Sequence, residues 1–416
     1  MLSLSGLLLR LMGMGYQVWL SGRLGAEGMG LMQLVLTVGL FAGTLASSGI
    51  RPAVLQQAAR RQGEGDLPAA AGTLRAALCW GLGLSALVGL CLIVGSGLIS
   101  RVLLKEAATA PAIRVLGVLL PLELLCGILG AGYTALGRVR ELVSVELLER
   151  VFSLGLTLLF LHMAKGSLSA TLCAVVGGSY GSAVLSVLLL WSGVRRQPFC
   201  GGQLRPLLAL CLPLALNDYL RSGLSSVEQF LIPYGLERSG SRHRALAAYG
   251  TVCGMVFPVL FFPASVLYAL SDLLVPELAR AKARRDKKRA FGLARRCLRG
   301  TALFAGCVFF LYWTCGGLLG KLLYHSPQAG YYLRIFAPMV LFLYLDAIVD
   351  GMQKGLGQQL FLVRYNSFTN LLDVVLLFLL LPRWGMAGFV VTYCFTHLVN
   401  FFLSLRRLLL ALSEVG

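Results

Sequence analysis

Residues 76–99 read AALCWGLGLSALVGLCLIVGSGLI, an apolar run without a charged side chain that lies between Arg75 and Arg101. A helix needs about 20 such residues to cross the hydrocarbon core of a bilayer. The run is continuous and Leu-rich, whereas a strand of a membrane barrel alternates apolar and polar residues. Since every backbone N–H and C=O must be bonded within the membrane, this stretch predicts a transmembrane helix.

The whole chain has the same character. Of its 416 residues, 57% are hydrophobic and 13% are charged, and the mean hydropathy is +0.78. Soluble domains carry about 25% charged residues. We therefore predict an all-α polytopic membrane protein with about twelve transmembrane helices. The expected spans are 2–20, 29–50, 76–99, 113–136, 142–163, 168–193, 207–234, 247–272, 300–323, 332–356, 366–382 and 385–405.

Charge placement and missing motifs narrow the function. The net charge of +19 is concentrated in short loops between the spans, which favours a multi-pass protein of the cytoplasmic membrane with both termini in the cytoplasm. Residues 1–20 have no basic leader and no convincing cleavage site, so we expect them to form a retained first helix. No CxxC pair, ATP-binding loop or metal-ligand spacing is present in the sequence. We expect a transporter rather than an enzyme, with no metal, no cofactor and no nucleic-acid partner.

The two halves of the sequence resemble each other. The alignment that pairs Arg114 with Arg334 also pairs Leu136-Gly137 with Leu356-Gly357. A slightly shorter offset relates Arg10 to Arg221 in the earlier part of each half. Secondary transporters are often built from such repeats, with the binding site where the repeats meet. We predict two pseudo-symmetric six-helix lobes, residues 1–200 and 201–416.

Two arginines lie well inside predicted spans at corresponding places in the two halves, Arg10 on the first helix of the first lobe and Arg221 on the first helix of the second. A charge at mid-bilayer costs about 2.5–3.5 kcal/mol on insertion scales, so it normally faces protein or a water-filled cavity. A guanidinium group binds phosphate well because its planar fork donates two hydrogen bonds. We interpret these arginines as a site for an anionic group. Alternatively, Arg10 extends to a lipid headgroup, and Asp218 neutralises Arg221.

Acidic side chains within the spans are candidates for coupling to a cation or proton, or for balancing the arginines. Glu123 follows Pro121 by two residues and has the alternative role of a hydrogen-bonded packing residue. Asp350 has the alternative role of an ion-pair partner of Lys354. The candidate ion-coupling or cavity residues are Glu123, Asp218, Glu228, Asp272, Asp346, Asp350 and Asp373.

The segment 279–299 contains ten Lys and Arg residues and one Asp. Its position between predicted spans indicates a cytoplasmic interfacial helix with a role in topology. A more specific interpretation is contact with anionic lipid headgroups.

Several stretches resemble the polysaccharide transporter branch of the multidrug/oligosaccharidyl-lipid/polysaccharide (MOP) superfamily, especially its stage V sporulation protein B-like members. The first is Leu20 to Leu34, LSGRLGAEGMGLMQL, followed by Ser47 to Ile50, SSGI. The others are Asp350 to Gln359, DGMQKGLGQQ, then Arg364 to Asn366, RYN, and Leu381 to Gly388, LPRWGMAG. The similarity extends through both halves.

The resemblance implies a V-shaped, MATE-like protein that works by alternating access, and a monomer. The implied cargo is a saccharide linked to undecaprenyl diphosphate, such as a lipid-linked oligosaccharide or a peptidoglycan precursor. Arg10 and Arg221 match the arginines thought to engage the diphosphate in related flippases, and Arg51 is a weaker third candidate. Members commonly have fourteen helices, so the groove formed by the last pair is absent from the predicted spans.

The residues leave three functions open. The first is a flippase or exporter for a lipid-diphosphate-linked saccharide, serving polysaccharide, cell-wall or spore synthesis. The second is a multidrug-type antiporter driven by Na⁺ or H⁺. The third is a non-transporting scaffold for envelope enzymes. Charges within the spans favour the first two.

Overall fold

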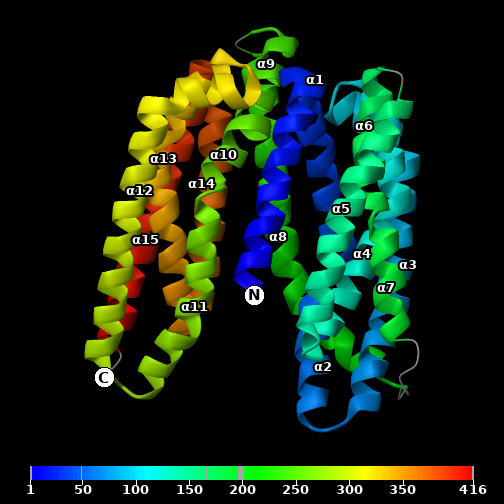
Figure 1. The fold of residues 1–416 in the computed structure, drawn as a ribbon, viewed down its shortest axis with the longest axis vertical. Helices are drawn as coiled ribbons and strands as arrows, with labels where there is room; N and C mark the ends of the chain where they lie inside the picture. Colours follow the sequence, from blue (N-terminus) through cyan, green and yellow to red (C-terminus); the bar gives the residue numbers. More distant parts are fainter. Residues whose placement is uncertain (1, 48, 165, 195–200, 239, 415–416) are drawn as a thin grey trace. The chain divides into compact units, whose positions relative to one another are not determined.

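The computed structural model describes residues 2–47, 49–164, 166–194, 201–238 and 240–414 (Figure 1). Within these ranges the secondary structure is helical and contains no strand. Nine of the described helical segments are long and apolar enough to cross a membrane, which confirms the predicted all-α membrane fold. The α-helices are α1 Leu2–Ser47, α2 Ile50–Gly63, α3 Leu67–Leu98, α4 Ala110–Ala135, α5 Val139–Met163, α6 Leu168–Gly181, α7 Ala183–Val194, α8 Leu204–Glu237, α9 Arg242–Tyr249, α10 Phe257–Phe261, α11 Ala264–Ala283, α12 Lys287–Tyr324, α13 Pro327–Gly355, α14 Gln359–Trp384 and α15 Met386–Ser413. Short π and 3₁₀ segments are η1 Ile99–Leu103, η2 Ala107–Thr109 and η3 Gly250–Val256.

Several predicted boundaries are wrong. The first two spans form one helix, α1, with a kink at Gly25, whose φ of 66° suits glycine. The eighth span, 247–272, divides between α10 and α11, where Pro263 precedes the first residue of α11. The expected loop 51–75 is helical apart from a short turn around Asp66. Within the expected loop 194–206, residues 195–200 lie outside the described residues, and residues 204–206 begin α8.

The basic segment 279–299 is also different from the prediction, because it forms no separate interfacial helix. It comprises the end of α11, a turn and the start of α12. Arg285 adopts φ of 52° in this turn. Asp286 caps α12 by accepting a hydrogen bond from the Arg289 N–H at 2.9 Å. The segment is therefore the tip of a helical hairpin.

The chain divides into two compact units that differ from the predicted lobes 1–200 and 201–416. Unit 1 contains Ser3–Gly30 and Val227–Gly416, and unit 2 contains Leu31–Ser226. Close backbone packing explains why the start of α1 belongs to unit 1. A Cβ atom on Gly30 would lie 2.4 Å from Leu246 O, which leaves room only for glycine there. In addition, Gln17 Nε2 donates a hydrogen bond to Gly254 O at 3.2 Å.

Equivalent hairpins occur in the two units, at positions that the alignment of the halves places together. In unit 2, Gln62 Nε2 at the end of α2 donates to Leu136 O at 3.4 Å. In unit 1, Lys282 Nζ at the end of α11 donates to Leu356 O at 2.6 Å. Asp66 caps α3 as Asp286 caps α12. The repeat found in the sequence is therefore also a repeat of contacts.

Each unit is built around one central helix. In unit 2, α4 packs against α2, α3, α6 and α7. In unit 1, α13 packs against α11, α12 and α15. Of the polar candidates, Glu123 lies on α4 and Asp346 and Asp350 lie on α13.

Candidate substrate and ion sites

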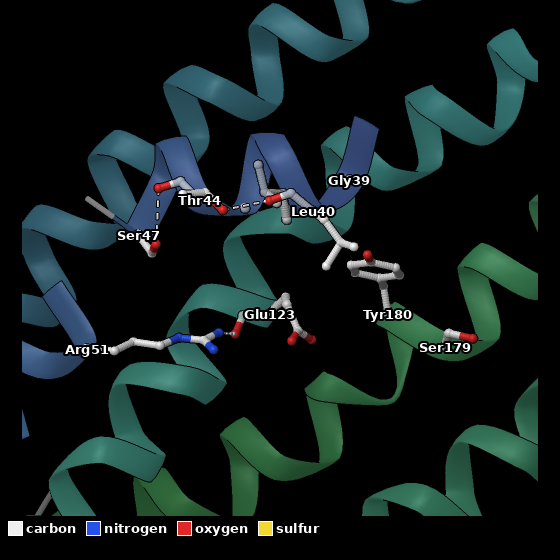
Figure 2. A pocket seen from close by; sticks show the side chains of 10 residues that line it. Gly39, Leu40, Thr44, Ser47, Arg51, Glu123, Ser179 and Tyr180 are labelled. Carbon is white, nitrogen blue, oxygen red and sulfur yellow. Dashed lines mark hydrogen bonds between the residues drawn. The ribbon is translucent and has the colours of Figure 1, made fainter. Parts of the chain in front are cut away.

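A pocket inside unit 2 has a volume of about 320 Å³ (Figure 2). Helices α1, α4 and α6 supply most of its wall, and Arg51 comes from the start of α2. We call this cavity the unit 2 pocket. Its lining residues are Gly39, Leu40, Gly43, Thr44, Ser47, Arg51, Leu120, Glu123, Ser179 and Tyr180.

Arg51 and Glu123, both predicted from the sequence, meet in the unit 2 pocket. The Arg51 Nη2 group donates a hydrogen bond to the backbone oxygen of Glu123 at 3.4 Å. The Glu123 side chain extends to the side of its backbone away from the Arg51 guanidinium group (Figure 2). No described salt bridge joins the two side chains, so the pocket presents a cationic and an anionic group separately.

A second pocket lies inside unit 1 and contains Arg10. Its volume is about 260 Å³. The Arg10 guanidinium carbon lies 5.4 Å from the centre of the Tyr268 ring, within the range of a cation–π interaction. Gln17 lines the same pocket and bonds to η3, whose π-helical geometry is frequent at functional sites. We call this cavity the unit 1 pocket, and its lining residues are Arg10, Met14, Gln17, Pro258, Phe261, Phe262 and Tyr268.

Three predicted acids of unit 1 lie in a network of hydrogen bonds among α8, α13, α14 and α15. The Tyr393 hydroxyl donates to the Glu228 carboxylate, and the Glu228 side chain is buried. The Thr396 hydroxyl donates to Asp373 Oδ1 at 2.6 Å. Buried carboxylates without such donors carry a large desolvation cost.

Asp346 is the third acid of this network. Asn400 Nδ2 donates to Asp346 Oδ2 at 2.6 Å. The Thr369 hydroxyl in turn donates to Asn400 Oδ1 at 3.3 Å, which links α14 to the same group. Asp350 follows one helical turn later and is half-buried.

The remaining candidates are less enclosed. Asp218 is half-buried on α8, and Arg221 is exposed one turn later. No ion pair joins them in the part of the chain that the structure describes. Asp272 is exposed on α11. The joint site of Arg10 and Arg221 stays a prediction, since Arg10 belongs to unit 1 and Arg221 to unit 2.

Glu149 on α5 is a candidate that the sequence analysis missed. Ser182, in the break between α6 and α7, and Ser186, on α7, donate hydrogen bonds to its carboxylate. The Cys126 thiol of α4 lies 3.8 Å from Glu149 Oε2. The signal was present, because Glu149 is an acidic residue within a predicted span, close to Glu146.

No group of three or more His, Cys, Asp or Glu side chains with metal-binding geometry occurs among the described residues. The acids are instead hydrogen-bonded by hydroxyl, amide and phenol groups. These contacts suit proton or monovalent-cation chemistry, and the pockets suit polar ligands.

Comparison with known proteins adds independent evidence. Residues 1–234 match the family model described as Polysaccharide biosynthesis protein, and residues 239–379 match the model described as MatE. Stage V sporulation protein B of Bacillus subtilis (strain 168) is 20% identical over 368 residues, which cover 85% of this chain and 71% of that protein. Sporulation protein YkvU of the same strain is 22% identical over 175 residues, 42% of this chain and only 39% of the length of YkvU.

Among solved structures, the inward-facing form of a multidrug resistance MATE family transporter of the MOP superfamily has the same fold. The TM-score is 0.74 at 17% identity, and the superposition covers 98% of this chain and 96% of that chain. This likeness concerns the fold.

Proposed function

Because the chain belongs to the polysaccharide biosynthesis protein family and is a membrane transporter of the MOP superfamily, we propose that it is a flippase. Its cargo would be a lipid-diphosphate-linked oligosaccharide or peptidoglycan precursor, moved across the cytoplasmic membrane by alternating access. The family match to residues 1–234 supports a saccharide cargo. The arginines of the two units support an anionic linkage in that cargo.

The observation that carries this proposal is the environment of Arg10. Its side chain is exposed in the unit 1 pocket and is held by the face of Tyr268, and no carboxylate pairs with it among the described side chains. An unpaired guanidinium group in a membrane span carries a free-energy cost, and such a residue usually marks a functional site. A diphosphate is a suitable partner because it accepts bidentate, charge-assisted hydrogen bonds. Arg221 and Arg51 are the proposed further contacts in unit 2.

The acids of unit 1 are the proposed ion-coupling groups. Glu228, Asp346 and Asp373 are surrounded by hydroxyl and amide groups that can ligate a small cation or relay a proton. Asp350, Glu123, Asp218 and Asp272 complete the proposed set. Binding of a cation here would neutralise buried charge and thereby bias one state of the transporter.

The distribution of Lys and Arg along the chain bears on its orientation in the membrane and on its contacts with lipid. We propose that both termini are cytoplasmic, because Lys and Arg concentrate in the loops on that side. The basic tip formed by α11 and α12 would then contact anionic lipid headgroups. We further propose that the chain acts as a monomer, as its resemblance to the MOP superfamily implies.

The test is a translocation assay in proteoliposomes with a fluorescent undecaprenyl-diphosphate disaccharide. Arg10→Ala and Arg221→Ala are each expected to reduce translocation at least tenfold, about 1.4 kcal/mol. Arg10→Lys should retain part of the activity because charge remains while the planar fork is lost. Unchanged translocation in the Arg10→Ala, Arg221→Ala double variant would exclude the mechanism.

A multidrug-type antiporter driven by Na⁺ or H⁺ is the second candidate. The MatE match to residues 239–379 and the buried carboxylates of unit 1 favour it. It predicts efflux of organic cations that stops when the ion gradient is dissipated. Overexpression without any gain in drug tolerance would count against it.

A further inference from the structure

We infer that the unit 2 pocket binds the saccharide portion of the transported molecule. This inference rests on the proposed flippase function and adds a subsite to it. It assigns one sugar residue to the hydroxyl-lined cavity between α1, α4 and α6, which lies within unit 2, where Arg51 can donate to the sugar as well as to the adjoining phosphate.

Hydroxyl groups make up most of the polar lining. Thr44 Oγ1 donates to Leu40 O at 2.9 Å, and Ser47 Oγ donates to Thr44 O at 3.1 Å (Figure 2). Both hydroxyls therefore retain lone pairs that can accept from a ligand. The side chains of Ser179 and Tyr180 form no hydrogen bond to any described residue, so they can both donate and accept. A sugar ring presents the complementary set of donors and acceptors.

The charged groups of the pocket favour a neutral polar ligand. The Arg51 guanidinium group uses one N–H on the backbone oxygen of Glu123, at 3.4 Å, and keeps further N–H donors for a ligand. The Glu123 carboxylate in the same pocket balances the charge of Arg51. A carboxylate can accept from two neighbouring sugar hydroxyls, while Arg51 donates to a ring or carbonyl oxygen. A simple organic cation would gain less here, because Arg51 opposes the attraction of Glu123.

The shape of the pocket also fits one sugar residue. Its volume of about 320 Å³ is at the lower end of the range of about 300–1,000 Å³ for small-molecule sites. Gly39 allows Tyr180 to approach α1, since a Cβ atom there would lie 3.0 Å from the Tyr180 hydroxyl. Gly43 leaves open space, because no atom lies within 4 Å of a Cβ atom built on it. The tyrosine ring and Leu40 provide the apolar surface on which a sugar ring packs.

Open space at Gly43 provides a direct test. Gly43→Leu would place a side chain in the pocket from a position where a Cβ atom meets no neighbour within 4 Å, and leucine is favoured over glycine in a helix. Gly83→Leu on α3 is the matched control, because Gly83 is exposed, lies outside the pocket and also has no atom within 4 Å of a Cβ position. Binding is measured in nanodiscs with two fluorescent probes, undecaprenyl diphosphate and the same lipid carrying N-acetylglucosamine.

Gly43→Leu is expected to weaken binding of the sugar-bearing probe about tenfold and to leave binding of the bare lipid diphosphate unchanged. Glu123→Gln should act in the same direction, with Glu146→Gln on α5 as its control. Arg10→Ala should weaken both probes. If Gly43→Leu leaves the affinity for the sugar-bearing probe unchanged, or lowers the affinities for both probes equally, the saccharide inference is wrong. The proposed flippase function would not be affected by either result. If wild-type protein binds neither probe, the proposed function fails with the saccharide inference.

Discussion

Gly250 lies where η3 meets α1, and replacing it with alanine is expected to destabilise unit 1. A Cβ atom on Gly250 would lie 2.0 Å from Ala26 O and 2.4 Å from Gly30 N. Non-bonded carbon atoms are stable at separations of about 3.5–4.0 Å, so α1 would have to move by roughly 1.5 Å. Overpacking in a well-packed interior costs about 1–3 kcal/mol. Because the contacted atoms are backbone atoms that cannot rotate away, we expect about 3 kcal/mol, the upper end of that range.

The assay for Gly250→Ala is thermal unfolding of the purified protein in detergent, followed by intrinsic fluorescence. Gly300→Ala on α12 is the control, because a Cβ atom there has no neighbour within 4 Å and alanine is favoured over glycine in a helix by about 1 kcal/mol. We expect the midpoint to fall by several degrees for Gly250→Ala and to stay the same or rise for Gly300→Ala. Equal midpoints for the two variants would refute the packing argument.

Three further perturbations test other contacts. Lys282→Ala removes the charge-assisted hydrogen bond to Leu356 O and should cost about 1.5–3 kcal/mol of unfolding free energy, whereas Gln62→Ala, which removes the longer neutral bond to Leu136 O, should cost less in the same denaturation assay. Asp373→Asn should abolish the dependence of translocation on an ion gradient, while Glu146→Gln at an exposed position on α5 should retain it; gradient-dependent flux in both would exclude Asp373 as a coupling group. Replacing Arg284, Arg285 and Lys288 together with glutamine should reduce the stimulation of transport by phosphatidylglycerol in reconstituted vesicles, and an unchanged lipid response would exclude the basic tip as a headgroup site.

The sequence was sufficient to predict the class of fold, because every backbone N–H and C=O of a membrane span must be hydrogen-bonded within the protein. It also predicted the repeat, since Gly137 and Gly357 both adopt positive φ, of 72° and 73°, at equivalent turns. The sequence analysis did not predict the helical hairpins. The basic composition of 279–299 predicts a separate interfacial helix, whereas a short turn and the capping residue Asp286 make the segment the tip of a hairpin between α11 and α12.

The division into units could not be read from the sequence for a different reason. A cut near residue 200 follows the repeat, but the start of α1 packs against η3 through Gly30 and Gly250. The only sequence sign of this backbone contact is two glycines far apart in the chain, and nothing in the sequence distinguishes them from the other glycines. Likewise, Glu123 was predicted as an intramembrane acid, but its position in a hydroxyl-lined pocket depends on Thr44 and Tyr180, which no spacing rule connects.

The repeat itself explains why Glu149 escaped notice. In the alignment that pairs Gly137 with Gly357, Cys126 corresponds to Asp346 and Glu149 to Thr369. In unit 1 the carboxylate is on the central helix α13 and the hydroxyl is on α14, and Asn400 bridges them. In unit 2 the carboxylate is on α5, and the central helix α4 offers the Cys126 thiol.

Each unit thus keeps one carboxylate at the same helix contact, but on opposite sides of it. A comparison of the halves residue by residue pairs an acid with a neutral residue at both positions, and so conceals a shared feature. Since a buried carboxylate requires donors wherever it lies, the hydrogen-bond partners on neighbouring helices are the more reliable mark of equivalence. By that measure both units retain a carboxylate where the central helix meets its neighbour, and in unit 2 a second acid, Glu123 on α4, lines the hydroxyl-lined pocket.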